Sequence, residues 1–107
     1  MDAVKRFFKY IAVDTQSNED CAECPSSKGQ LELGKMLVEE LHELGCTDAE
    51  QDRYGYVYAS IPATTAKKLP VIGFIAHLDT APDLGGKCTN PQLVQYKGGD
   101  IKLIPIP

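Results

Sequence analysis

The chain has 107 residues, of which 43% are hydrophobic, so it suffices for one domain with an apolar core. Its 11 basic and 15 acidic residues give a formal net charge of −4 without a basic cluster, which excludes the usual polyanion binders, and we expect no nucleic-acid partner. No apolar run reaches the ~18 residues of a membrane span, and the N-terminus lacks the order of an export signal, so we expect no membrane partner and a cytoplasmic location.

The first residues predict a short amphipathic helix. Val4, Phe7, Phe8 and Ile11 recur at helical spacing and form one apolar stripe. Asp2 can cap the start of this helix. We interpret the stripe as a core-packing face rather than a membrane-surface face.

A polar loop over residues 14–28 precedes the strongest helix prediction, residues 27–44. Its apolar residues step by three or four, at Leu33, Leu37, Leu41 and Leu44. Ser26 or Ser27 can cap its start, and Gly45 stands where a left-handed residue ends a helix. We expect its glutamates to lie mostly on the opposite, solvated face, namely Glu39, Glu40 and Glu43.

After Gly45 the hydrophobic period changes from helical to extended. Residues 53–55 predict a turn, and residues 56–61 alternate as in a strand with one buried face. Residues 69–76 (LPVIGFIA) form a continuous apolar run, which predicts a strand buried on both faces beneath helices. The order of elements indicates an α/β class, with helices packed on a mixed sheet.

The predicted domain is incomplete at its C-terminal side. A strand that is buried on both faces needs neighbours on each side, and two helices with one hairpin supply few. Turn residues accumulate from Pro82 onward, and residues 103–107 alternate apolar residues with prolines. We therefore expect an incomplete domain.

A histidine and a carboxylate follow the apolar run directly. His77 and Asp79 are two residues apart, so in an extended chain they point to the same side at the strand's C-terminal end, where open α/β sheets place ligands. One imidazole nitrogen can bind a metal ion while the carboxylate accepts the other N–H and fixes the tautomer. The pattern is common by chance, and a histidine satisfied within the core is the competing interpretation.

Residues 72–83 (IGFIAHLDTAPD) resemble the first metal motif of the peptidase T family of two-zinc aminopeptidases. Further segments agree in order and spacing with that family, namely residues 14–17 (DTQS), 25–27 (PSS), 29–30 (GQ), 90–92 (NPQ) and 96–101 (YKGGDI). The resemblance covers essentially the whole chain, residues 1–107.

The resemblance implies a zinc-dependent enzyme that releases the N-terminal residue of tripeptides. Residues 1–107 would be the N-terminal portion of its catalytic domain. The family uses two zinc ions that share a bridging aspartate, a glutamate as general base, and a smaller lid domain that commonly supports dimerisation. The small-peptide substrate, the zinc ions and the homodimer formed through the lid are expectations of this resemblance, and the lid itself is absent here.

Position by position, the resemblance assigns two residues. His77 would be a ligand of one zinc ion, and Asp79 would be the active-site carboxylate that orients it. The family's other ligands and its general base have no counterpart in this sequence. A catalytic zinc needs three protein ligands and an open position, so we expect the isolated 107 residues to be inactive.

Two other hypotheses remain open from the residues. The chain could be a non-enzymatic truncated domain that associates with itself, or a zinc or redox module built on the Cys21–Cys24 CxxC pair. Cys46 and Cys88 stand alone, so we interpret the loop cysteines as incidental. We expect His42 to face solvent on the second helix.

Overall fold

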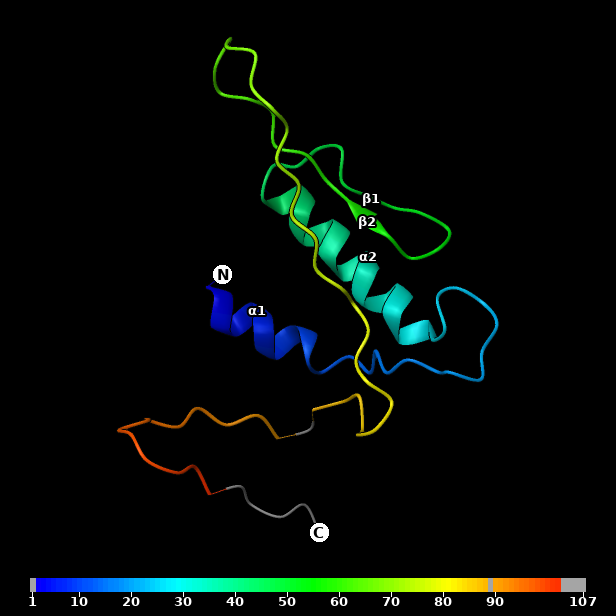
Figure 1. The fold of residues 1–107 in the computed structure, drawn as a ribbon, viewed down its shortest axis with the longest axis vertical. Helices are drawn as coiled ribbons and strands as arrows, with labels where there is room; N and C mark the ends of the chain where they lie inside the picture. Colours follow the sequence, from blue (N-terminus) through cyan, green and yellow to red (C-terminus); the bar gives the residue numbers. More distant parts are fainter. Residues whose placement is uncertain (1, 89, 103–107) are drawn as a thin grey trace.

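Two helices and a small two-stranded sheet form the regular secondary structure of the residues that the structure describes (Figure 1). The structure, a computed structural model, describes residues 2–88 and 90–102. The elements are α1 (Ala3–Tyr10), α2 (Lys28–Glu43), β1 (Glu50–Gln51) and β2 (Val57–Tyr58). They agree with a partial α/β arrangement, although the described residues form no larger mixed sheet. None of the helices among these residues is long and apolar enough to cross a membrane.

Helix α1 begins as the sequence predicts but packs differently. The backbone N–H of Lys5 donates to Asp2 Oδ1 at 2.9 Å, which confirms Asp2 as the cap. The prediction of a core-packing apolar stripe is wrong: Val4 is 48% exposed, Phe7 is 58% exposed, and no residue of α1 is buried. The contact of α1 with α2 is polar instead, through the carboxylate of Glu40.

Helix α2 confirms the predicted position and ends. Ser27 occupies the N-cap position, although its side chain makes no capping hydrogen bond. At the other end Gly45 has φ +96°, its N–H donates to His42 O, and the N–H of Cys46 donates to Leu41 O, both at 2.9 Å. These two bonds form a Schellman motif, which explains why the helix stops at a glycine.

The hairpin is shorter than the alternation predicts. Strands β1 and β2 are antiparallel, with Glu50 opposite Tyr58 and Gln51 opposite Val57. The predicted turn at residues 53–55 is confirmed, and Gly55 takes φ +86° there. The ladder ends at Tyr58 because the N–H of Ser60 donates to the side chain of Asp48 and not to a strand partner.

Very little of the described chain is buried. The buried apolar residues are Leu33 and Ala49, and the buried polar ones are Thr15, Gln30 and Glu40. The radius of gyration is 17.4 Å, whereas a compact domain of this length has about 13 Å. The expectation that Glu40 lies on a solvated face is wrong, since it is 3% exposed.

The predicted buried strand at residues 69–76 is not formed. The segment has no secondary structure and overlaps α2 in the view of Figure 1, a cavity lies between them, and Val71, Phe74 and Ile75 are 95–100% exposed. The physical reason is the lack of neighbours: within the described residues no other segment forms backbone hydrogen bonds with residues 70–78. The prediction for residues 103–107 lies outside the described residues.

Candidate functional site

His77 and Asp79 lie against each other, as their spacing predicts. His77 Nδ1 is 2.9 Å from Asp79 Oδ1, and the two side chains are 82% and 48% exposed. An ionised carboxylate only accepts, so Nδ1 carries the proton in this bond. In the neutral imidazole Nε2 is then left with its lone pair, and it has no hydrogen-bonding partner among the described residues. This is the tautomer in which a histidine can bind a metal ion through Nε2.

The residue after Asp79 ties the pair to the N-terminal half of the chain. Thr80 forms a parallel bridge with Gln16, in which Thr80 N–H donates to Thr15 O at 3.2 Å and Ser17 N–H donates to Thr80 O at 2.9 Å. The pair thus sits immediately before an anchored point, although the segment that precedes it is exposed.

A cavity of about 1000 Å³ borders His77 and Asp79. The same cavity is lined by the apolar face of α2, including Leu37 and Leu41, and by the hairpin residues 54–58. His77 therefore faces open space and is not enclosed in apolar packing. The cavity separates residues 74–79 from the helix face, which is consistent with the exposure of this segment.

The pair fits one zinc ligand together with its orienting carboxylate, and it does not complete a metal site. A catalytic zinc has three protein ligands. Within residues 2–88 and 90–102 no three histidine, cysteine, aspartate or glutamate side chains gather as metal ligands would. Ligands for a complete site would have to come from outside this part of the chain.

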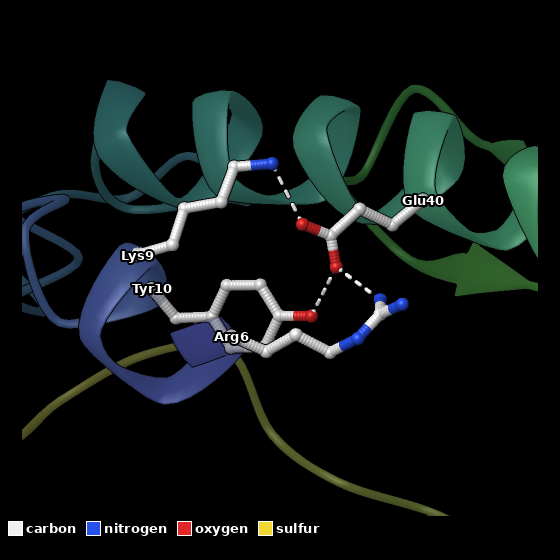
Figure 2. A network of polar contacts seen from close by, with 4 residues as sticks. All are labelled: Arg6, Lys9, Tyr10 and Glu40. Carbon is white, nitrogen blue, oxygen red and sulfur yellow. Dashed lines mark hydrogen bonds and ion pairs between the residues drawn. The ribbon is translucent and has the colours of Figure 1, made fainter. Parts of the chain in front are cut away.

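A second polar cluster, centred on Glu40, joins the two helices (Figure 2). Arg6 Nη1 and Lys9 Nζ lie 2.6 Å from the carboxylate, and Tyr10 Oη donates to it at 2.5 Å. Hydrogen bonds from Lys9 and Tyr10 lower the pKa of Glu40 from 4.5 to about 2. Burial raises the pKa of Tyr10, and its hydrogen bond to Glu40 adds to the effect. Three side chains of α1 thus donate hydrogen bonds to one carboxylate of α2, and these bonds fix α1 on α2.

The remaining candidates form no site among the described residues. All four cysteines are free thiols. Cys21 and Cys24 lie in the loop before α2, whereas Cys46 and Cys88 lie in other parts of the chain. His42 is exposed, as predicted, and its Nε2 lies 2.9 Å from Ala49 O. The cysteine-module hypothesis therefore gains no support from the geometry.

The sequence is similar to curated proteins named peptidase T. It is 53% identical over 103 residues to peptidase T of Listeria welshimeri, 52% to that of Bacillus subtilis and 50% to that of Geobacillus thermodenitrificans. Each alignment covers 95% of this chain and 25% of the relative. No protein-family model matches the chain.

The chain spans about a quarter of the length of the curated relatives it matches. The alignment spans 103 of the 107 residues and therefore includes the segment that carries His77 and Asp79. The resemblance to peptidase T that the motifs predict is therefore confirmed over nearly the whole of this chain.

Proposed function

We propose that this chain is part of the catalytic domain of a peptidase T, a zinc-dependent aminopeptidase that releases the N-terminal residue of tripeptides. In this proposal His77 is a zinc ligand through Nε2, and Asp79 orients it by accepting the proton on Nδ1. The single observation that carries the proposal is the 2.9 Å contact between these side chains, within a sequence about half identical to peptidases T.

The pair contributes to the chemistry by making the His77 imidazole a better ligand for a metal ion. Asp79 holds the imidazole in one tautomer and raises the basicity of Nε2, which strengthens metal binding. Bound zinc supplies Lewis-acid chemistry, by lowering the pKa of a water and polarising the scissile carbonyl. The other ligands and the general base belong to the part of the protein that this chain does not span.

The isolated 107 residues are inactive in this proposal, because they contribute one ligand where a catalytic zinc needs three. The complete protein acts on small peptides, resides in the cytoplasm, and forms a homodimer through a lid domain. The similarity to peptidase T over 95% of the chain favours this function over a non-enzymatic domain or a cysteine module.

The test is a hybrid protein in which this chain replaces the matching quarter of the Bacillus subtilis peptidase T. Because the two sequences are 52% identical, the replacement should preserve packing. We expect the hybrid to release the N-terminal residue of a tripeptide, to lose activity when zinc is chelated, and to regain it when zinc is restored. The isolated chain with added zinc is the matched control.

A hybrid that folds, as judged by its unfolding midpoint, and yet hydrolyses no tripeptide with zinc present would refute the assignment. Turnover by the isolated chain would refute the part of the proposal that concerns its inactivity.

A further inference from the structure

Residues 14–17 form the point where three distant segments meet. Thr15, which is 2% exposed, receives hydrogen bonds at its carbonyl from Gln30 Nε2 (3.3 Å) and from the N–H of Thr80 (3.2 Å). The loop is therefore fixed to helix α2 on one side and to the residue that follows Asp79 on the other. We call residues 14–17 the junction.

Two glycines show how closely the junction is packed. A Cβ at Gly29, in the first turn of α2, would lie 1.6 Å from the carbonyl oxygen of Asp14. A Cβ at Gly86 would lie 2.7 Å from Gln16 Cβ and 2.9 Å from Gln16 N. Only residues without a side chain fit at these two places, so the junction is held from both sides.

The side chain of Gln16 spans the start of the loop that follows the His77–Asp79 pair. Its Nε2 lies 2.5 Å from Pro82 O and 2.8 Å from Leu84 O. A glutamine amide has two N–H donors, and here both are used on backbone carbonyls, which lie 66 and 68 residues away in the sequence. These bonds fix the course of the backbone after Thr80.

The orientation of the His77–Asp79 pair depends on the fixed backbone that follows it. Within the described residues, no other segment forms backbone hydrogen bonds with residues 70–78, and the ring of His77 is held only by Asp79. Thr80 follows Asp79 directly and is bonded on both its N–H and its C=O. The orientation of the two side chains is therefore determined by the bonded residues that follow Asp79, and not by the residues that precede His77.

We propose that Gln16 is a positioning residue for the His77–Asp79 pair: by holding residues 80–84 against the junction, it aligns the Asp79 carboxylate with His77 Nδ1. Gln16 makes no hydrogen bond to either side chain among the described residues, and it acts through the backbone. The consequence for catalysis rests on the function proposed above, whereas the alignment itself is a property of this chain.

The first experiment measures the alignment in the 107-residue chain. Gln16→Glu keeps the size of the side chain but replaces two donors by an acceptor that faces two carbonyls. Gln95→Glu is the control, since Gln95 is exposed, has no hydrogen bond to the described residues and undergoes the same charge change. Ring nitrogen-15 chemical shifts at alkaline pH report which nitrogen of His77 carries the proton, with His42 as an internal reference.

We expect His77 to carry its proton on Nδ1 in the parent chain and in Gln95→Glu, because Asp79 accepts it. In Gln16→Glu the Nδ1–H signal should give way to a mixture with Nε2–H, and the amides of Ser17 and Thr80 should exchange at least ~10-fold faster with solvent, as expected for opening of a local hydrogen-bonded contact. An unchanged His77 tautomer in Gln16→Glu would overturn the proposal.

The second experiment uses the hybrid protein with the same two substitutions. We expect Gln16→Glu to lower zinc affinity and kcat by roughly 10- to 100-fold, as loss of support for a metal ligand does, while Gln95→Glu leaves both unchanged. Full zinc affinity and kcat in Gln16→Glu would contradict a positioning role in catalysis. If the unsubstituted hybrid is inactive, the proposed function fails, and the tautomer experiment still decides the alignment.

Discussion

Helix α2 with its hairpin and the apolar segment at residues 69–76 are both predicted to bury apolar side chains, but only the helix with its hairpin does so. Leu33 on α2 is 7% exposed, and Ala49 before β1 is 6% exposed. Val71 and Ile75 in the segment are 99% and 100% exposed. The helix satisfies its own backbone and finds the hairpin close by, whereas an extended segment needs partner strands for both its backbone and its side chains.

The comparison teaches that apolar sequence alone does not bury a strand. The segment has the composition of a central strand, but among the described residues the first backbone hydrogen bonds to another part of the chain come after it, at Thr80. In the function proposed here, the rest of the protein supplies those partners. The pair at residues 77 and 79 then lies between a part of the chain that is packed and a part that is not.

The largest expected difference between the two regions is in the rate at which a protease cleaves them. Lys68, directly before the exposed segment, and Lys35 on α2 are both exposed, but only Lys35 lies in a helix. We expect trypsin to cleave after Lys68 roughly a thousandfold faster than after Lys35, which corresponds to a local opening free energy of ~4 kcal/mol for the helix. Mass spectrometry of early digestion products measures this ratio. Equal rates would mean that α2 is no more stable than the segment.

Two glycine substitutions compare how tightly the chain is packed at the start of α2 and in the segment at residues 69–76. Gly29→Ala places a methyl group against the backbone oxygen of Asp14, which no side-chain movement can relieve, and should destabilise the fold by about 3 kcal/mol. Gly73→Ala has no atom within 4 Å of the new Cβ, so we expect a change below ~0.5 kcal/mol. Urea unfolding followed by circular dichroism measures both. Similar losses in the two variants would contradict the tight junction.

The contact between α1 and α2 should respond to pH and to removal of one charge. Glu40 has a pKa lowered from 4.5 to about 2, so its ionised form stabilises the folded state. This stabilisation is complete above about pH 4.5 and is lost as the pH falls toward 2. Glu40→Gln should weaken the contact at neutral pH by about 2 kcal/mol, as loss of hydrogen bonds to a charged group does.

Carbon-13 shifts of the α1 residues measure this contact, because a helix of eight residues is marginal without a partner. We expect helical shifts at pH 7 that move to coil values between pH 4.5 and 2 in the parent chain, and coil-like shifts throughout in Glu40→Gln. The exposed Glu39 provides the control variant Glu39→Gln. Helical α1 shifts that persist in Glu40→Gln would show that the apolar stripe, and not the carboxylate, holds the helix.

Local patterns predicted the elements whose stability is local. The cap at Asp2, the end of α2 at Gly45 and the turn at residues 53–55 depend on neighbours within a few residues, and all three are present. The contact of His77 with Asp79 follows from a spacing of two residues in the same way.

Long-range contacts could not be predicted from these patterns. The spacing of Glu40 from Leu33 and Leu44 places it on the apolar face of α2, unlike Glu39. That spacing does not reveal its partners, because the three side chains that bond to the carboxylate lie about 30 residues away in the sequence. The contacts of Gln16 cross 66 and 68 residues. The resemblance of residues 14–17 to peptidase T was the one available signal, and it identified the segment without assigning it a role.

The most direct test of the account compares zinc binding by two histidine variants of the hybrid protein. His77→Ala removes the proposed ligand, and His42→Ala removes the only other histidine of this chain. Titration against a competing chelator should show zinc affinity reduced at least ~100-fold in His77→Ala, beyond what loss of a supporting residue produces, and unchanged in His42→Ala. Zinc held equally tightly by both variants would contradict the assignment of His77 as a metal ligand.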